Sequence, residues 1–114
     1  MHEFSICRSI LREVERAARQ HNARAVTKIH LQLGPLATIT ADQLQQTLPL
    51  VSAGSIAADA ALVTELLPFR VRCDACQAET ETNPGLPVCG NCGAADVVPL
   101  SGDELLLTSV EFSS

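Results

Sequence analysis

Two Cys-x-x-Cys pairs constrain this chain more than any other sequence feature. Cys73 and Cys76 form the first pair, Cys89 and Cys92 form the second, and 12 residues separate the two pairs. Each pair presents two thiolates in one tight turn, and four thiolates complete the tetrahedral shell that Zn²⁺ prefers in structural sites. The spacing therefore predicts a structural Zn²⁺ site with no open coordination position for catalysis.

Other interpretations of the four cysteines remain open at this stage. They could be free thiols, they could form two disulfides, or they could hold iron in a rubredoxin-like site. Because the surrounding segment has few apolar residues, we expect metal binding to supply much of its folding free energy. Cysteines in this pattern are typical of a reducing compartment. No apolar run approaches the roughly 18 residues of a membrane span, and the start of the chain does not resemble a secretion signal. We therefore expect a cytoplasmic protein.

Charge and composition narrow the class of partner. The chain has 114 residues, of which 46% are hydrophobic and only 3% aromatic, so its core must be built mainly from aliphatic side chains. Its formal charge is −5, and four thiolates (−4) with one divalent ion (+2) would bring that to −7. A chain this acidic, with no basic stripe, repels phosphate backbones. We therefore expect neither a nucleic-acid partner nor a membrane partner.

Hydrophobic periodicity predicts a helix near the N-terminus. The apolar positions at helical spacing are Ile6, Ile10, Val14 and Ala17. The opposite, solvent-facing side carries Arg8, Arg12, Glu15, Arg16 and Arg19. Ser5 is a candidate cap, and His21-Asn22 would end the helix. Cys7 lies on the apolar face, which favours a buried small hydrophobe over a reactive thiol.

A capping box predicts the start of a second helix. Thr40 and Gln43 stand in the relation that lets each side chain bond the other's backbone amide. Gly54 would end this helix, and Pro49 should kink or shorten it.

Three apolar segments predict strands. They cover residues 26–33, 61–69 and 105–112, and between residues 70 and 100 the periodicity disappears. An isolated terminal strand needs a sheet to join. The fold class is therefore α+β, with two helices on a mainly three-stranded sheet, a four-cysteine zinc-ribbon-like insert, and a last strand that returns to the first domain's sheet. We expect one domain from residues 1–69 plus 103–114, and a zinc-binding domain from 70–102.

The N-terminus offers a second candidate metal site. Methionine is retained before a large residue, so Met1 should supply an α-amine, while His2 supplies an amide nitrogen and an imidazole. Ni²⁺ and Cu²⁺ favour such nitrogen-rich planar shells, and Glu3 could add a carboxylate oxygen. From chemistry alone, a solvated histidine at this position is the commoner case, and the same holds for His21 and His30.

Taken together, "MHEFSIC" at the start, the four cysteines, and "GDELLLTSVEF" near the end resemble the HypA/HybF family of nickel-insertion proteins for [NiFe]-hydrogenase maturation. The resemblance implies that Met1, His2 and Glu3 bind nickel and that Cys73, Cys76, Cys89 and Cys92 bind zinc. It also implies a nickel metallochaperone rather than an enzyme, serving a hydrogenase large-subunit precursor with a HypB-like GTPase as partner. Some members of the family also use an Asp as a nickel ligand, and the matching position in this chain is Thr40, so that ligand is not carried over. We expect a monomer or a weak homodimer.

Two rival functions predict residues that the chain does not supply. A zinc-ribbon module that binds proteins or nucleic acid would carry basic or stacking residues around its knuckles, whereas this insert carries Asp74, Glu79, Glu81 and Asp96. A small metalloenzyme would need a general base beside an open metal position, and no His/carboxylate cluster has that spacing.

Overall fold

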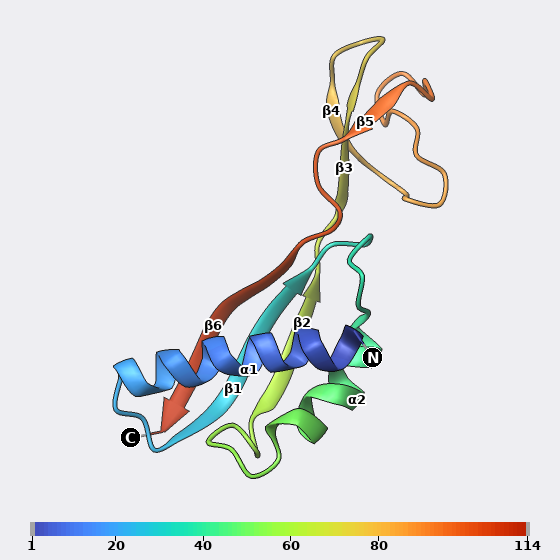
Figure 1. The fold of residues 1–114 in the computed structure, drawn as a ribbon. Helices are drawn as coiled ribbons and strands as arrows, with labels where there is room; N and C mark the ends of the chain where they lie inside the picture. The colour runs from blue at the N-terminus through green and yellow to red at the C-terminus, as the bar shows by residue number, and fades with distance from the viewer. Residues whose placement is uncertain (1, 114) are drawn as a thin grey trace. The chain divides into compact units, whose positions relative to one another are not determined.

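The computed structural model describes residues 2–113. Its elements in order are α1 (His2–Gln20), β1 (Ala25–Leu33), α2 (Ala41–Ser52), β2 (Ala61–Leu66), β3 (Phe69–Cys73), β4 (Glu79–Thr82), β5 (Val97–Pro99) and β6 (Leu105–Ser113). The strands form two three-stranded sheets, in the orders β2-β1-β6 and β4-β3-β5. The predicted α+β class is confirmed, and so is the return of the last strand to the sheet of the first (Figure 1).

The chain divides into two compact units. The first unit takes the chain up to Leu31, then Ile39–Glu65, and again from Leu106 onward. The second unit takes Gln32–Thr38 and Leu66–Leu105. The second unit is therefore built from two separate segments, one that begins at the end of β1 and one that runs from the end of β2 to the start of β6.

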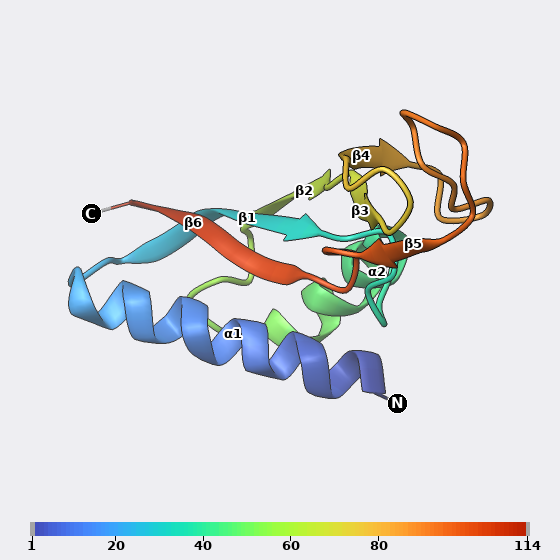
Figure 2. The same ribbon diagram turned by 90° about the horizontal axis from the view of Figure 1, so that it is seen from above.

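Both helices of the first unit cover the same face of the sheet β2-β1-β6 (Figure 2). The side chains buried between them come from α1, β1 and α2, and include Cys7, Val14, Ala18, Ile29, Leu31, Leu44 and Leu48. Burying one aliphatic side chain of this size contributes about 1.5–3 kcal/mol. This core is almost wholly aliphatic, as the composition predicted.

Helix α1 begins earlier than the sequence suggested. Its first residue is His2, so Ser5 lies inside the helix and is not its cap. The C-terminal end is as predicted: the His21 amide bonds the carbonyl of Ala17 at 3.2 Å, and Asn22 adopts a left-handed φ of 51°. Asparagine tolerates that conformation better than most residues, which is why it suits a helix end.

Helix α2 starts with the predicted capping box. The Gln43 amide donates to Thr40 Oγ1 at 3.1 Å, and the Thr40 amide donates to Gln43 Oε1 at 3.0 Å. Pro49 does not stop the helix, which continues to Ser52. Because Pro49 stands in the last turn, it removes one intrahelical donor, and only three helical residues follow it. Gly54, at φ 77°, follows the end of the helix.

The second unit contains strands that the sequence analysis did not predict. The expected strand 61–69 is wrong in its last part, because β2 ends at Leu66 and Phe69 opens β3. Strand β3 pairs antiparallel with both β4 and β5. Its side chains alternate between buried and exposed, so the periodicity does not vanish at residue 70. Five residues are too short a stretch for that alternation to stand out among cysteines, prolines and glycines.

Two glycines allow the 32–38 segment to lie against the chain around Gly102. The Gly34 amide donates to the carbonyl of Glu104 at 2.8 Å, and the Leu36 amide donates to the carbonyl of Gly102 at 2.5 Å. A Cβ atom at Gly34 would collide with the Gly102 carbonyl oxygen, so no larger residue fits. Gly102 itself has a φ of 146°, a conformation that L side chains rarely adopt.

Candidate metal centre

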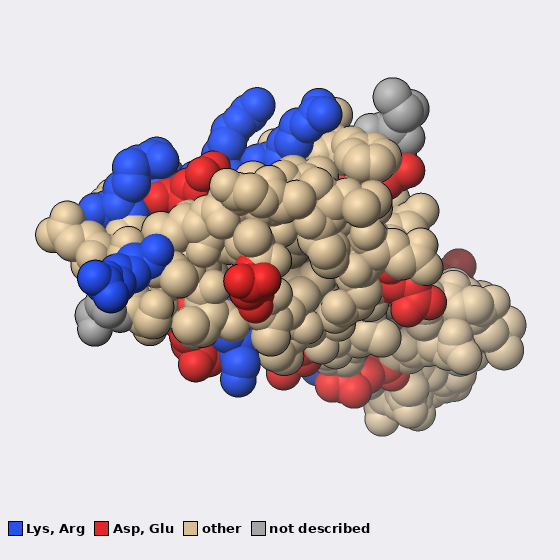
Figure 3. All heavy atoms as spheres, turned by 90° about the horizontal axis from the view of Figure 1, so that it is seen from below, with Lys and Arg blue, Asp and Glu red and all other residues tan. Residues whose placement is uncertain are grey.

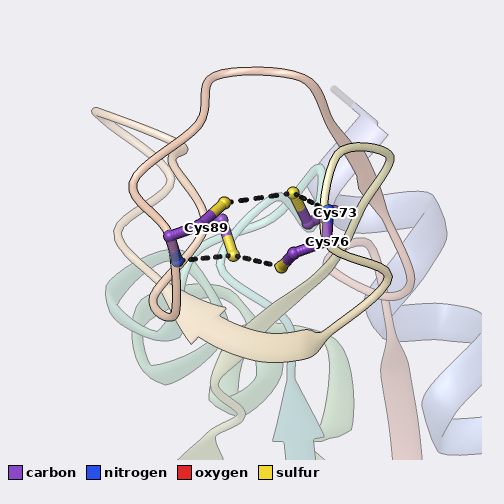
Figure 4. A group of neighbouring side chains, drawn as sticks. Cys73, Cys76 and Cys89 are labelled. Atoms are coloured by element: carbon purple, nitrogen blue, oxygen red, sulfur yellow. Dashed lines mark hydrogen bonds between the residues drawn. The ribbon is translucent and has the colours of Figure 1, made fainter.

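The four cysteines of the two pairs come together in the second unit (Figure 4). Their sulfur atoms all lie within 4.8 Å of one another. The closest contacts join the two pairs: Cys73 Sγ is 3.6 Å from Cys92 Sγ, and Cys76 Sγ is 3.6 Å from Cys89 Sγ. Four sulfurs about 2.3 Å from one Zn²⁺ stand about 3.8 Å apart at the corners of a tetrahedron. The donor set and its spacing therefore fit a single tetrahedral metal ion.

The two pairs form similar knuckles. In the first, the Cys73 amide donates to the carbonyl of Ala78 at 2.9 Å, and the Gln77 amide donates to the carbonyl of Cys73 at 2.9 Å. In the second, the Cys89 amide donates to the carbonyl of Ala94 at 2.8 Å, and the Gly93 amide donates to the carbonyl of Cys89 at 2.9 Å. The residue after each pair adopts a left-handed φ, 67° at Gln77 and 79° at Gly93. The backbone therefore holds both pairs in the same turn, although only one of them has glycine where the turn needs it.

Backbone amides point at the first sulfur of each knuckle. The amides of Ala75 and Cys76 donate to Cys73 Sγ at 3.3 and 3.4 Å. The amides of Asn91 and Cys92 donate to Cys89 Sγ at 3.3 and 3.4 Å. Such donors stabilise a thiolate, which is the form that binds metal.

These hydrogen bonds separate the pKa values of the thiols. The amide of Cys92, followed by that of Asn91, lowers the pKa of Cys89 to about 6. The amide of Ala78 and the side chain of Asn91 lower the pKa of Cys76. Cys92 also receives an amide, from Ala94, but its thiol neighbours, Cys73 foremost, and burial raise its pKa to about 11. Backbone amides therefore favour the thiolate form of Cys89, which is the form that binds metal.

Thr80 supports the second knuckle, a role that the sequence analysis missed. The Gly90 amide donates to Thr80 Oγ1 at 2.9 Å, and a Cβ atom at Gly90 would meet Thr80 Cβ at 3.1 Å. Thr80 belongs to β4, so the knuckle rests directly on the small sheet. The only sequence signal was the glycine inside the second pair, and it does not reveal which strand the knuckle contacts.

The N-terminal candidate residues lie in the first turn of α1. His2 Nδ1 stands 3.5 Å from Glu3 Oε2, and their side chains are 57% and 26% exposed. The structure thus places an imidazole and a carboxylate side by side within reach of solvent. Met1, the third residue of the predicted nickel site, lies outside the described residues.

The other two histidines each contact a side chain of β6. His21 packs against Phe112 with ring centroids 5.4 Å apart. His30 Nε2 stands 2.8 Å from Glu111 Oε2 on the neighbouring strand. Cys7 is buried, as predicted, and burial raises the pKa of its thiol. Among residues 2–113, the four thiols are the group of possible ligands that the fold assembles.

In the part of the chain that the structure describes, no helix combines the length and the hydropathy that crossing a membrane demands.

Comparison with known proteins shows similarity along nearly the whole chain. A family model described as "Hydrogenase/urease nickel incorporation, metallochaperone, hypA" matches residues 1–112. A protein named hydrogenase maturation factor HypA from Nitrosospira multiformis is 38% identical over 111 residues, covering 97% of this chain and 96% of the relative. A protein of the same name from Streptomyces avermitilis is 40% identical over 116 residues, covering 98% and 87%.

A solved structure has the same fold. The solution structure of the nickel metallochaperone HypA from Helicobacter pylori superimposes with a TM-score of 0.69, at 20% identity, over 98% of this chain and 97% of the other. With a whole-length family match, relatives above 30% identity and four assembled thiols, the chain belongs to the HypA family of nickel-incorporation metallochaperones.

Proposed function

We propose that this chain binds Ni²⁺ through Met1, His2 and Glu3 and delivers it to the large-subunit precursor of a [NiFe]-hydrogenase. The observation that supports this most is that the His2 imidazole, which is exposed, and the Glu3 carboxylate, which is half-buried, lie 3.5 Å apart in the first turn of α1. Family membership supports nickel as the cargo, and the relatives' names support hydrogenase maturation as the process.

The proposed ligands match the chemistry of Ni²⁺. An amine, an amide nitrogen and an imidazole give the nitrogen-rich shell that Ni²⁺ and Cu²⁺ bind more readily than Zn²⁺ does. The N-terminal end of α1 carries a partial positive charge, which disfavours a cation. A deprotonated amide and the Glu3 carboxylate would offset that charge. A site that binds against this field holds its ion weakly, which suits a protein whose task is to give the ion away.

We further propose that the four cysteines hold a structural Zn²⁺. The ion would cross-link two knuckles and two strands of the second unit. Residues 1–69 with 103–114 would then form the nickel-binding domain and residues 70–102 the zinc-binding domain. All four positions around the zinc would be occupied by thiolates, so its role would be structural and not catalytic.

The proposed setting is the cytoplasm, where reduced thiols persist. The partners would be a HypB-like GTPase and the hydrogenase precursor, with no nucleic acid and no enzymatic turnover by the chain itself. The chain would work as a monomer or a weak homodimer.

The test is a calorimetric titration of zinc-loaded protein with Ni²⁺, using the native start and a version with one residue added before Met1. The addition leaves every cysteine in place but moves the α-amine away from His2. We expect about one Ni²⁺ per native chain in the micromolar range and loss of that binding in the extended version. Equal binding by both versions would place nickel elsewhere, and binding by neither would refute the proposed cargo site.

A further inference from the structure

A groove between α1 and α2 lies on the surface of the first unit. It has a volume of about 380 Å³ and is lined by Phe4, Arg8, Leu11, Arg12, Glu15, Leu50 and Val51. The five residues from α1 share one face, because they are separated by three, four or one positions. Leu50 is 67% exposed, and Phe4, Leu11 and Val51 are half-buried. Apolar side chains that are partly open to solvent therefore line the groove together with charged ones.

The charged residues that line this groove are Arg8, Arg12 and Glu15, so two positive charges and one negative leave it with a formal charge of +1 although the chain as a whole is acidic. Arg8 and Arg12 stand one helical turn apart, both exposed. Within residues 2–113 neither has a hydrogen-bond or ion-pair partner, whereas Arg16 on the same helix pairs with Glu13. Figure 3 shows Lys and Arg side chains along the edge that α1 forms, with some acidic side chains among them. The local charge is thus opposite in sign to the net charge of −5.

We propose that this groove docks an acidic amphipathic helix of a partner protein. An apolar stripe on that helix would cover Phe4, Leu11 and Leu50, and two carboxylates one turn apart would meet Arg8 and Arg12. A helix suits the groove because it satisfies its own backbone hydrogen bonds, and the walls, being helices themselves, offer no strand edge for an extended peptide to join. Two carboxylates at i and i+4 reproduce the spacing of the two arginines.

The charges indicate how such a partner would be selected. Carboxylates that approach Arg8 and Arg12 are attracted before contact, and a basic helix is repelled. Contact with the apolar side chains of the groove then stabilises the bound partner, because burial of exposed leucine and phenylalanine surface is favourable. This inference does not depend on nickel, and its test contains none.

The test is a selection for binding, followed by measured affinities. A display library of 18-residue helices would keep a fixed leucine stripe and draw its other positions from Glu, Lys, Gln and Ser. Full-length, zinc-loaded protein is the target. We expect the selected helices to be acidic, with carboxylates one turn apart, and to bind more weakly as salt is raised from 50 to 500 mM.

Variants on α1 locate the bound helix. Arg8→Ala with Arg12→Ala should raise the Kd of a selected peptide at least about tenfold, the loss expected for two contacts near the centre of an interface. The matched control, Arg16→Ala with Arg19→Ala, removes the same charge from the same helix outside the groove and should change the Kd less than about threefold. All four positions are exposed and alanine favours helix, so folding is preserved.

Other outcomes would overturn the proposal. Selection of basic or uncharged helices, selection of none, or equal effects of the two double variants would each contradict it. Binding to vesicles containing 30% anionic lipid that needs Arg8 and Arg12 would identify a membrane surface as the occupant. Self-association that disappears in the Arg8/Arg12 variant, measured by sedimentation equilibrium, would identify a second copy of the chain.

Discussion

In the first unit, two helices and a sheet bury aliphatic side chains against one another; in the second, a small sheet carries four thiols on its turns. The hydrophobic residues buried in the second unit are Leu33, Phe69, Val71, Cys73 and Cys89, so two of its few core positions are candidate metal ligands. An apolar core of that size supplies little free energy against chain entropy. We therefore expect the first unit to fold mainly by apolar burial and the second to depend on a metal ion held by its four thiols.

Loss of one thiol should have the largest effect, and it should destabilise the second unit much more than the first. In Cys89→Ser, we expect loss of bound zinc and of amide protection at Val71, because structural zinc sites contribute about 10–16 kcal/mol of apparent binding free energy. Amide protection at Val14 in α1 should remain within about tenfold of the original. Elemental analysis and hydrogen exchange followed by NMR measure both effects.

The matched control is Cys7→Ala, which removes a buried thiol from the first unit. It should retain zinc and reduce protection in α1 instead. Collapse of protection at Val14 in the Cys89 variant would show that the units do not fold by separate means.

The second prediction breaks the first unit instead. Leu31 is 1% exposed, so Leu31→Ala should lower the free energy of unfolding by about 2–5 kcal/mol through lost burial and a cavity. The zinc content should not change. Urea denaturation followed by circular dichroism gives the free energy. Leu106→Ala, at a position 47% exposed, is the control and should cost less than about 1 kcal/mol. Loss of zinc from the Leu31→Ala variant would contradict the view that the two units are stabilised separately.

The third prediction compares the two knuckles with each other. Gly93 has a φ of 79° with open space around its missing Cβ, so Gly93→Ala should cost the backbone penalty alone, about 1–2 kcal/mol. Zinc should then bind about 5–30 times more weakly in competition with a chromophoric chelator. Gln77→Gly relieves the same strain in the first knuckle and should tighten zinc binding or leave it unchanged. If Gln77→Gly instead weakened the site, the two turns would not be equivalent.

The smallest effect concerns the outer face of the first unit's sheet. The hydrogen bond with His30, followed by the charge of Lys28, lowers the pKa of Glu111 below the ordinary value of 4.5. A carboxyl group with a depressed folded-state pKa stabilises the fold above its unfolded-state pKa, and that stability is lost as the pH falls through the folded value. The difference in unfolding free energy between the native chain and Glu111→Gln should therefore shrink as the pH falls below 4.5. A difference that grows on acidification would have the wrong sign.

Much of the fold could be predicted because its signals are local. The capping box joins Thr40 and Gln43 across one turn, and the end of α1 depends on Asn22 and its immediate neighbours. The start of α1 was missed because an N-terminal helix can begin without a capping residue, so Ser5 was a misleading signal. Strand β3 could not be predicted because it is short and because loops without periodicity separate it in sequence from its partners β4 and β5.

The sequence by itself determined the ligand chemistry: which four thiols stand in pairs, which residues cap the second helix, and which side chains are apolar. Those features depend on groups a few positions apart, whose geometry the backbone restricts. Only the tertiary structure decided that Cys73 lies nearest Cys92 and Cys76 nearest Cys89. It alone also decided that Thr80 supports a knuckle, that His30 meets Glu111, and that Arg8 and Arg12 line a groove. Such contacts join residues far apart in the chain, and they exist because packing of the whole unit, rather than any local preference, brings those surfaces together.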